Sequence, residues 1–194
     1  MGAMTTASGV LKKNRLSRRT GMTTGTPRAE TLVMAEGGPD SVYMREGKYG
    51  PYQVVVRSAS STLIVDEPFG AGGLGSGPTP FDLLSAALGS CALMTMRRYA
   101  TDREWPLEQL VVRVSHDRPA LASMDRFLME IQIEGSLTAH QLDALVDVAT
   151  RCPLHVTMAR GSDIETRLIQ PGELPDMAIG KTAHLRAMKE ACEH

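Results

Sequence analysis

The chain has 194 residues, 42% of them hydrophobic and 22% charged, which is enough for one folded domain with a sizeable core plus tails. Its formal net charge of −1 gives no general electrostatic reason to expect binding to nucleic acid or to a membrane. No apolar run approaches the roughly 20 residues of a membrane-spanning helix, and the N-terminus lacks the apolar core of a secretion signal. We therefore expect a cytoplasmic protein.

The first 29 residues are expected to form a tail that contains a basic stretch at 12–19. The alternatives are an anionic partner, a targeting signal and a solvated flexible arm, and the composition favours the arm.

Between residues 30 and 66 the pattern is typical of short β-strands. Candidate strands are 31–34, 42–45, 52–57 and 62–65, and a hairpin turn at 58–61 separates the last two.

A segment rich in glycine and proline, residues 68–78, predicts a flexible loop. It is not a phosphate-binding loop, because no Gly-Lys-Ser/Thr follows it and no GxGxxG opens a helix after a strand. A long helix is predicted next, over residues 80–101. Thr79 can cap this helix, Pro80 fits its first position, and Asp82 stands where the acid of a capping box belongs.

One face of this helix carries a thiol. Leu84, Ala87, Leu88 and Cys91 follow at i, i+3, i+4 and i+7, so they share that face. A cysteine in this place is either a quiet core residue or a reactive group held in a dry pocket. Small residues keep the helix thin and would let another element pack close: Ala86, Ala87, Gly89 and Ser90.

Two clear strands are predicted at 110–116 and 127–134, joined by a hairpin-sized loop at 117–125. A last strand is predicted at 164–169, and residues 171–194 are expected to form a C-terminal extension with a short helix. Because strands pair in hairpins and helices are grouped apart from them, this order predicts an α+β fold.

A second thiol lies at the end of another predicted helix. Thr138 and Gln141 have the spacing of a capping box that begins this helix. Cys152 follows seven residues after Leu145 on the same face, and Pro153 should disrupt or restart the helix there.

Other cysteine chemistry is less favoured. Cys91, Cys152 and Cys192 are too few and too scattered for a disulfide scaffold, and they fit a reducing compartment. No CxxC or HxxxH spacing points to a metal site, so neither a metal nor a cofactor is expected. We expect Cys192 to be a bystander.

The two cysteine segments carry a family resemblance. One begins Gly-Pro-Thr-Pro-Phe-Asp-Leu-Leu at residue 77 and ends at Cys91, and the other is Thr-Arg-Cys-Pro-Leu at 150–154. Together they resemble the two cysteine motifs of the OsmC/Ohr family, the osmotically induced and organic hydroperoxide resistance proteins. Three neighbouring stretches also resemble the family: residues 66–68, 94–100 and 105–107. The resemblance as a whole covers about residues 42–169.

This resemblance implies an OsmC-like domain over residues 30–170, with antiparallel sheets packed on a long central helix that carries Cys91. It also implies an intertwined homodimer with two sites at the subunit interface. In the active peroxidases of the family, the first cysteine attacks a hydroperoxide and the second resolves the sulfenic acid as a disulfide. A dithiol such as lipoamide, or another thiol, then reduces the disulfide. By motif match, Cys91 is the peroxidatic thiol and Cys152 the resolving one.

The chain departs from the peroxidases at one position. They carry a glutamate ten residues before the first cysteine, where this sequence has Phe81. Asp82, one residue later, points away from Cys91 on an ideal helix, and a capping role suits it better. The family arginine corresponds to Arg45 or Arg57, and no motif decides between them. The motif therefore resembles a broader OsmC-like branch that lacks the peroxidase glutamate.

Two hypotheses follow from these residues. The first is a thiol-dependent peroxidase of the oxidative stress response that reduces organic hydroperoxides through a Cys91 sulfenate resolved by Cys152. The alternative is a non-enzymatic OsmC-like dimer that binds a small apolar ligand or senses oxidants. The first hypothesis predicts a hydroperoxide and a thiol or dithiol reductant as partners. Surface or core roles are expected for three histidines: His116, His140 and His155.

Overall fold

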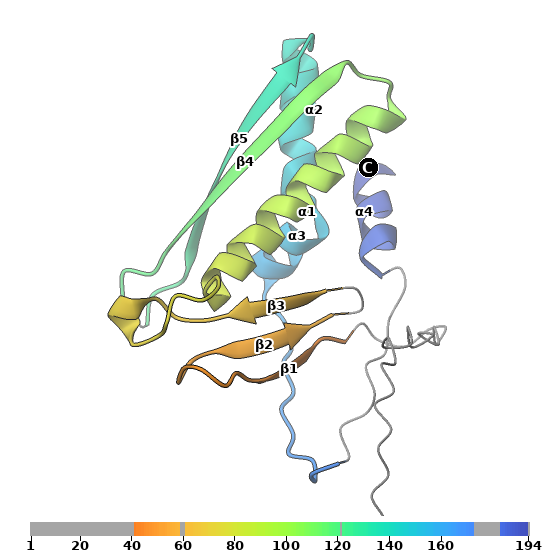
Figure 1. Cartoon of the computed structure of the whole chain (residues 1–194). Coiled ribbons are helices and arrows are strands. Elements are labelled where there is room, and N and C mark those ends of the chain that lie inside the picture. The colour runs from red at the N-terminus through yellow and green to blue at the C-terminus, as the bar shows by residue number, and fades with distance from the viewer. Residues whose placement is uncertain (1–40, 59–60, 121, 173–182, 194) are drawn as a thin grey trace, which may run out of the picture. The chain divides into compact units, whose positions relative to one another are not determined.

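The structure is a computed structural model that describes residues 41–58, 61–120, 122–172 and 183–193. Within these residues the fold is α+β, with two antiparallel sheets and four α-helices (Figure 1). The α+β class predicted from the element order is therefore confirmed. The expected tail at 1–29 and the candidate strand at 31–34 lie outside the described residues.

The first sheet is built from β1 (Tyr43–Glu46), β2 (Val54–Arg57) and β3 (Thr62–Val65), paired antiparallel in sequence order. Valine, isoleucine and threonine dominate β2 and β3, and β-branched residues fit a pleated backbone well. β3 occupies the predicted residues, and the predicted turn before it closes through a bond from Ser58 N–H to the Ser61 carbonyl, 3.0 Å long.

The glycine-rich segment after β3, which includes the short 3-10 turn η1 (Phe69–Ala71), is organised by one carboxylate. Asp66 is 1% exposed. Its oxygens accept hydrogen bonds of 2.7 to 3.2 Å from the backbone N–H groups of Glu67, Leu74 and Ser76 and from the Ser76 hydroxyl. The Ser76 hydroxyl is the largest cause of the lowered pKa of Asp66. The predicted loop is thus held around a single anion.

Helix α1 (Pro80–Asp102) begins as the sequence predicts. The Thr79 hydroxyl accepts from the Asp82 N–H at 3.2 Å, and the Asp82 carboxylate accepts from the Thr79 N–H at 2.9 Å. This reciprocal capping box satisfies backbone donors that have no partner inside the helix. The expectation that Asp82 serves the cap is confirmed.

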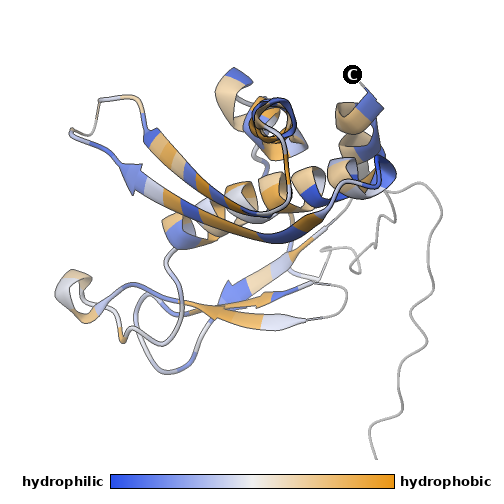
Figure 2. Ribbon diagram, turned by 90° about the horizontal axis from the view of Figure 1, so that it is seen from above, coloured by the Kyte–Doolittle hydropathy of each residue, from blue (hydrophilic) through white to orange (hydrophobic). Residues whose placement is uncertain are grey.

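A long hairpin of β4 (Leu107–Asp117) and β5 (Arg126–Gly135) packs against α1 through β4. Hydrophobic and hydrophilic residues alternate along both strands, which gives the hairpin one apolar face (Figure 2). A Cβ atom on Gly89 would lie only 3.1 Å from the side chain of Val114 and 3.4 Å from that of Val112. The small residue predicted to allow close packing does so here.

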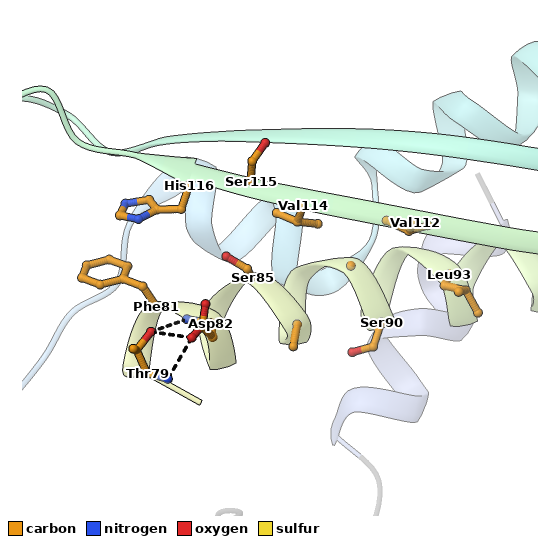
Figure 3. Close-up of a pocket in the computed structure, with 12 residues that line it drawn as sticks. Thr79, Phe81, Asp82, Ser85, Ser90, Leu93, Val112, Val114, Ser115 and His116 are labelled. Atoms are coloured by element: carbon orange, nitrogen blue, oxygen red, sulfur yellow. Dashed lines mark hydrogen bonds between the residues drawn. The ribbon is translucent and has the colours of Figure 1, made fainter. Parts of the chain in front are cut away.

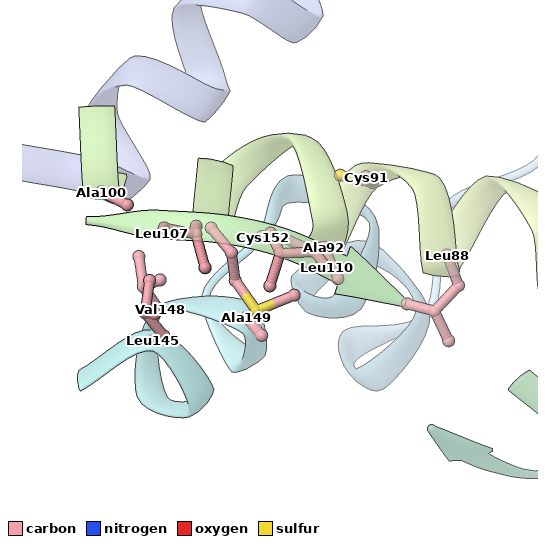
Figure 4. Close-up of a cluster of buried hydrophobic side chains, with 11 residues drawn as sticks. Leu88, Cys91, Ala92, Ala100, Leu107, Leu110, Leu145, Val148, Ala149 and Cys152 are labelled. Carbon is pink, nitrogen blue, oxygen red and sulfur yellow. The ribbon is translucent and has the colours of Figure 1, made fainter. Parts of the chain in front are cut away.

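Three further helices pack against α1: α2 (Ala139–Thr150), α3 (Pro153–Arg160) and α4 (Ala183–Glu193). The predicted capping box of Thr138 and Gln141 begins α2 and is confirmed. The helices and the hairpin bury one apolar cluster, whose members include both motif cysteines (Figure 4): Leu88, Cys91, Ala92, Met96, Ala100, Leu107, Leu110, Leu145, Val148, Ala149 and Cys152.

One sequence expectation is wrong. The predicted strand at 164–169 is an irregular segment, with Ile164 82% and Leu168 95% exposed. Its alternating pattern suits a strand, but a strand also needs a neighbour to bond with, and the described chain supplies none there. Leu84 lies in the same helix as Cys91, at the spacing that places the two on one face, but it is exposed. Burial along that face begins at Leu88.

Candidate functional site

The two motif cysteines come together from different elements of the core. Cys91 lies in the middle of α1 and is 3% exposed, and Cys152 lies between α2 and α3 and is 0% exposed. Both are free thiols. Figure 4 shows them in the same cluster of buried side chains.

A break between two helices gives Cys152 its position. Pro153 occupies the first position of α3, as expected from its fixed backbone angle, and Cys152 becomes the N-cap. The Cys152 sulfur accepts a hydrogen bond from the His155 N–H at 3.4 Å. The neighbouring Leu154 N–H donates to the Cys91 sulfur at 3.5 Å. The start of α3 therefore supplies one backbone donor to each thiol.

The Cys91 sulfur has a third neighbour from the far end of the chain. Nε2 of His184, in the first turn of α4, lies 3.3 Å from it. The His184 side chain is exposed, so this contact joins a buried sulfur to a group in reach of solvent.

The surroundings separate the acidities of the two thiols. The pKa of Cys91 is lowered to about 5, mainly by the hydrogen bond from the Cys152 thiol and further by His184 and the Leu154 N–H, while burial opposes the shift. The pKa of Cys152 is raised, first by Cys91 and then by burial. One thiol is thus favoured as the anion and the other as its proton-bearing partner.

The sequence gives only a weak signal for His184, because the residue lies outside both cysteine motifs. The available signal is its spacing. His184, Met188 and Cys192 follow at i, i+4 and i+8, and Met188 and Cys192 are buried. Cys192, expected to be a bystander, packs on α1, where its thiol donates to the Thr95 carbonyl at 3.7 Å.

The residues matched to the family's arginine and glutamate stand elsewhere. Arg45, on β1, donates to the Glu46 carbonyl at 3.2 Å, and Arg57, on β2, is exposed. Within the described part of the chain, neither contacts Cys91. Phe81 stacks on His116 with ring centroids 4.2 Å apart (Figure 3).

The Phe81 neighbourhood forms an ion cluster of its own at the tip of the hairpin. Asp125 pairs with His116 at 2.7 Å and accepts hydrogen bonds from Nε and Nη2 of the Arg118 guanidinium. These contacts, that of Arg118 first, lower the pKa of Asp125 to about 2. The expectation for His116, a structural role, agrees with these contacts.

A cavity in the described part of the chain is separate from the thiols. It has a volume of about 750 Å³ and lies between α1 and β4, with Phe81, Gly89, Val112 and His116 among its lining residues (Figure 3). Neither Cys91 nor Cys152 lines it. In the described ranges, no group of three or more His, Cys, Asp or Glu side chains could hold a metal ion, and no helix is long and apolar enough to cross a membrane.

Comparison with known proteins agrees with this arrangement. Residues 73–167, which include both thiols, match the family model described as OsmC-like protein. This part of the chain belongs to the OsmC family. No curated protein matches the sequence.

Solved structures show the same fold. An OsmC-like protein from Mycoplasma pneumoniae is 18% identical with a TM-score of 0.55, covering 63% of this chain and 89% of that one. A protein from Psychrobacter arcticus 273-4, named for osmotic stress induction and the detoxification response, is 21% identical with a TM-score of 0.54, covering 62% and 88%. At these identities the likeness establishes the OsmC-like fold.

Proposed function

We propose that this OsmC-family protein is a thiol-dependent peroxidase that reduces organic hydroperoxides. The observation that carries the proposal is the pairing of Cys91 and Cys152, in which the first thiol is favoured as the anion and the second as the proton donor. A peroxidatic cysteine must be a thiolate, and a second thiol nearby protects it from over-oxidation. Membership of the OsmC family supports a redox role in the stress response.

The chemistry balances in three steps. The Cys91 thiolate attacks one peroxide oxygen, the O–O bond breaks, and the alkoxide leaves and takes a proton to become the alcohol. Cys91 is then a sulfenic acid, and attack by the Cys152 sulfur forms the disulfide and releases water. A dithiol reductant restores both thiols and leaves as its own disulfide.

The surroundings of Cys91 support a bulky organic substrate over hydrogen peroxide. The sulfur lies within a cluster of aliphatic side chains, including Leu88 and Ala92, and an apolar lining favours the alkyl part of a hydroperoxide. Because Cys91 is 3% exposed, substrate entry requires neighbouring side chains to move.

Homodimerisation is part of the proposal. Ile164 and Leu168 lie four positions apart in the irregular segment at 164–169, and both side chains are almost fully exposed. A second copy of the chain could cover them by strand pairing, which would also give the segment the neighbour that it lacks.

The test is consumption of cumene hydroperoxide with dihydrolipoamide as reductant. Wild type should turn over repeatedly, and Cys91→Ser should fall to the uncatalysed rate, since a hydroxyl is a far weaker nucleophile at neutral pH. Ser90→Ala, one residue away with an exposed side chain, is the matched control and should keep the wild-type rate. Absence of turnover by wild type contradicts the proposal.

One observation favours the second candidate, a non-enzymatic oxidant sensor. In the described chain no arginine contacts Cys91, and the glutamate position of the peroxidases holds Phe81, stacked on His116. A sensor would form the Cys91–Cys152 disulfide once per oxidant and would not be reduced quickly by dithiols. Stoichiometric oxidation without turnover in the same assay would therefore select this candidate.

A further inference from the structure

The C-terminal helix α4 is fixed against α1 by its buried face. Met188 and Cys192 are both buried, and the Cys192 thiol donates to the Thr95 carbonyl, one turn after Cys91. His184 precedes Met188 by four residues, so it lies on the same face. Packing of this face therefore brings His184 to the level of Cys91.

Two arginines hold the other end of α4. Arg151 donates to the Ala191 carbonyl at 3.2 Å, and Arg103 donates to the Cys192 carbonyl at 3.5 Å. Cations suit the C-terminal end of a helix, where carbonyl groups lack partners inside the helix. Arg151 also pairs with Asp147 at 3.0 Å and directly precedes Cys152, so the same residue ties α4 to the second thiol.

Among the titratable groups around Cys91, His184 is the one best placed to exchange a proton with its sulfur. Two titratable side chains contact the Cys91 sulfur among the described residues, Cys152 from the α2–α3 junction and His184 from α4. Arg103 and Arg151 are directed at the terminal carbonyls of α4. Near Cys192, Arg98 pairs with Asp102, and on α4 Lys189 pairs with Glu193. An imidazole is the side chain best suited to exchange protons near neutral pH.

We propose that His184 is a catalytic residue of the Cys91 site, which the C-terminal helix contributes in place of the charged pair of the family's peroxidases. His184 accepts the Cys91 thiol proton, which leaves a thiolate facing the ring. Where the proposed peroxidase function holds, the same proton passes to the alkoxide that leaves when the O–O bond breaks, and His184 returns to neutral imidazole. The proton and the electron pair are then both accounted for.

The test is the pH titration of Cys91 in the full chain, followed by NMR through the ¹³C shift of its Cβ atom, which needs no reagent to reach the buried sulfur. Wild type should titrate well below the ordinary thiol range, with a midpoint near pH 5. His184→Ala should raise the midpoint by about one to three pH units, the range that an adjacent opposite charge produces. His184→Gln, which keeps a donor but not the charge, should lie between them.

His140→Ala is the matched control, because His140 is also an exposed histidine in the first turn of a helix, α2. It should titrate like wild type. A Cys91 midpoint in His184→Ala equal to that of wild type, or an ordinary thiol midpoint in wild type itself, overturns the inference. Should His184→Ala unfold, the Gln variant decides alone.

The hydroperoxide assay separates this inference from the proposed function. A low Cys91 midpoint that depends on His184, without turnover of cumene hydroperoxide by wild type, supports the inference while the peroxidase proposal fails. Turnover by wild type, with His184→Ala equal to it in both rate and midpoint, supports the peroxidase and overturns the role of His184.

Discussion

Two histidines packed on α1 have contrasting environments. Near the start of the helix, His116 contacts the rings of Phe81 and Phe127, and its Nε2 pairs with Asp125. In the middle of the helix, His184 is exposed and its Nε2 faces the sulfur of Cys91. The His116 imidazole contacts two aromatic rings and a carboxylate, whereas the His184 imidazole contacts solvent and the Cys91 sulfur.

The hairpin-tip cluster and the surroundings of Cys91 are two separate groups of polar contacts. The cluster of His116, Arg118 and Asp125 balances its own charges at the tip of the hairpin. Phe81, at the position of the family's glutamate, belongs to this cluster and brings no acid to the thiols. The groups that lower the pKa of Cys91 come instead from the α2–α3 junction and from α4.

The largest effect is expected from Cys152→Ala, which acts on the Cys91 region alone. It removes both the resolving thiol and the main hydrogen bond that lowers the pKa of Cys91. Peroxide consumption should stop after one turnover, with Cys91 trapped as a sulfenic acid by dimedone, and the Cys91 titration midpoint should rise. Mass spectrometry after one equivalent of cumene hydroperoxide measures the adduct.

His116→Ala serves as the control for that variant and should keep repeated turnover, because His116 touches neither thiol. Sustained turnover by Cys152→Ala would show that another thiol resolves Cys91 and would remove Cys152 from the site.

A smaller effect, on stability in acid, is expected from Asp125→Asn. The pKa of Asp125 in the folded protein, about 2, lies below its ordinary value of 3.8, so the carboxylate contributes stability above pH 4 and loses it as pH falls through 2. Wild type should therefore lose more thermal stability than Asp125→Asn between pH 4 and 2. Calorimetric unfolding midpoints measured at both pH values provide the comparison, and parallel curves for the two proteins would refute it.

The smallest effect is expected from Phe81→Glu, which restores the family's acid. Ten residues of helix span about 15 Å, so the new carboxylate would pair with Arg118, which lies 5.2 Å from the Phe81 ring, and would not reach Cys91. The Cys91 titration midpoint should stay within about 0.3 pH units of wild type, because a screened charge at that distance acts weakly. A larger shift would show that the two regions are coupled.

Local signals in the sequence predict local structure well. Thr79 with Asp82 and Thr138 with Gln141 each predict a helix start, because the capping partners lie three residues apart and need no distant contact. The strand predicted at 164–169 fails for the opposite reason, since a strand depends on a neighbour that its own sequence does not encode.

In the candidate site too, local sequence signals predict some residues, and others depend on contacts between distant parts of the chain. Cys91 and Cys152 are predicted from motifs and helical periodicity, and the structure brings the two together. His184 is separated from Cys91 by 93 positions, and only the packing of α4 places it there. No spacing rule within a single element connects a histidine in one helix with a cysteine in another.

The position of α4 near the end of the chain also sets an order of events during synthesis. Cys91 leaves the ribosome 93 residues before His184, which at 5–20 residues per second is an interval of about 5 to 20 s. Throughout that interval the thiol lacks its imidazole neighbour. The contact between the Cys91 sulfur and His184 is therefore among the last that the Cys91 site acquires.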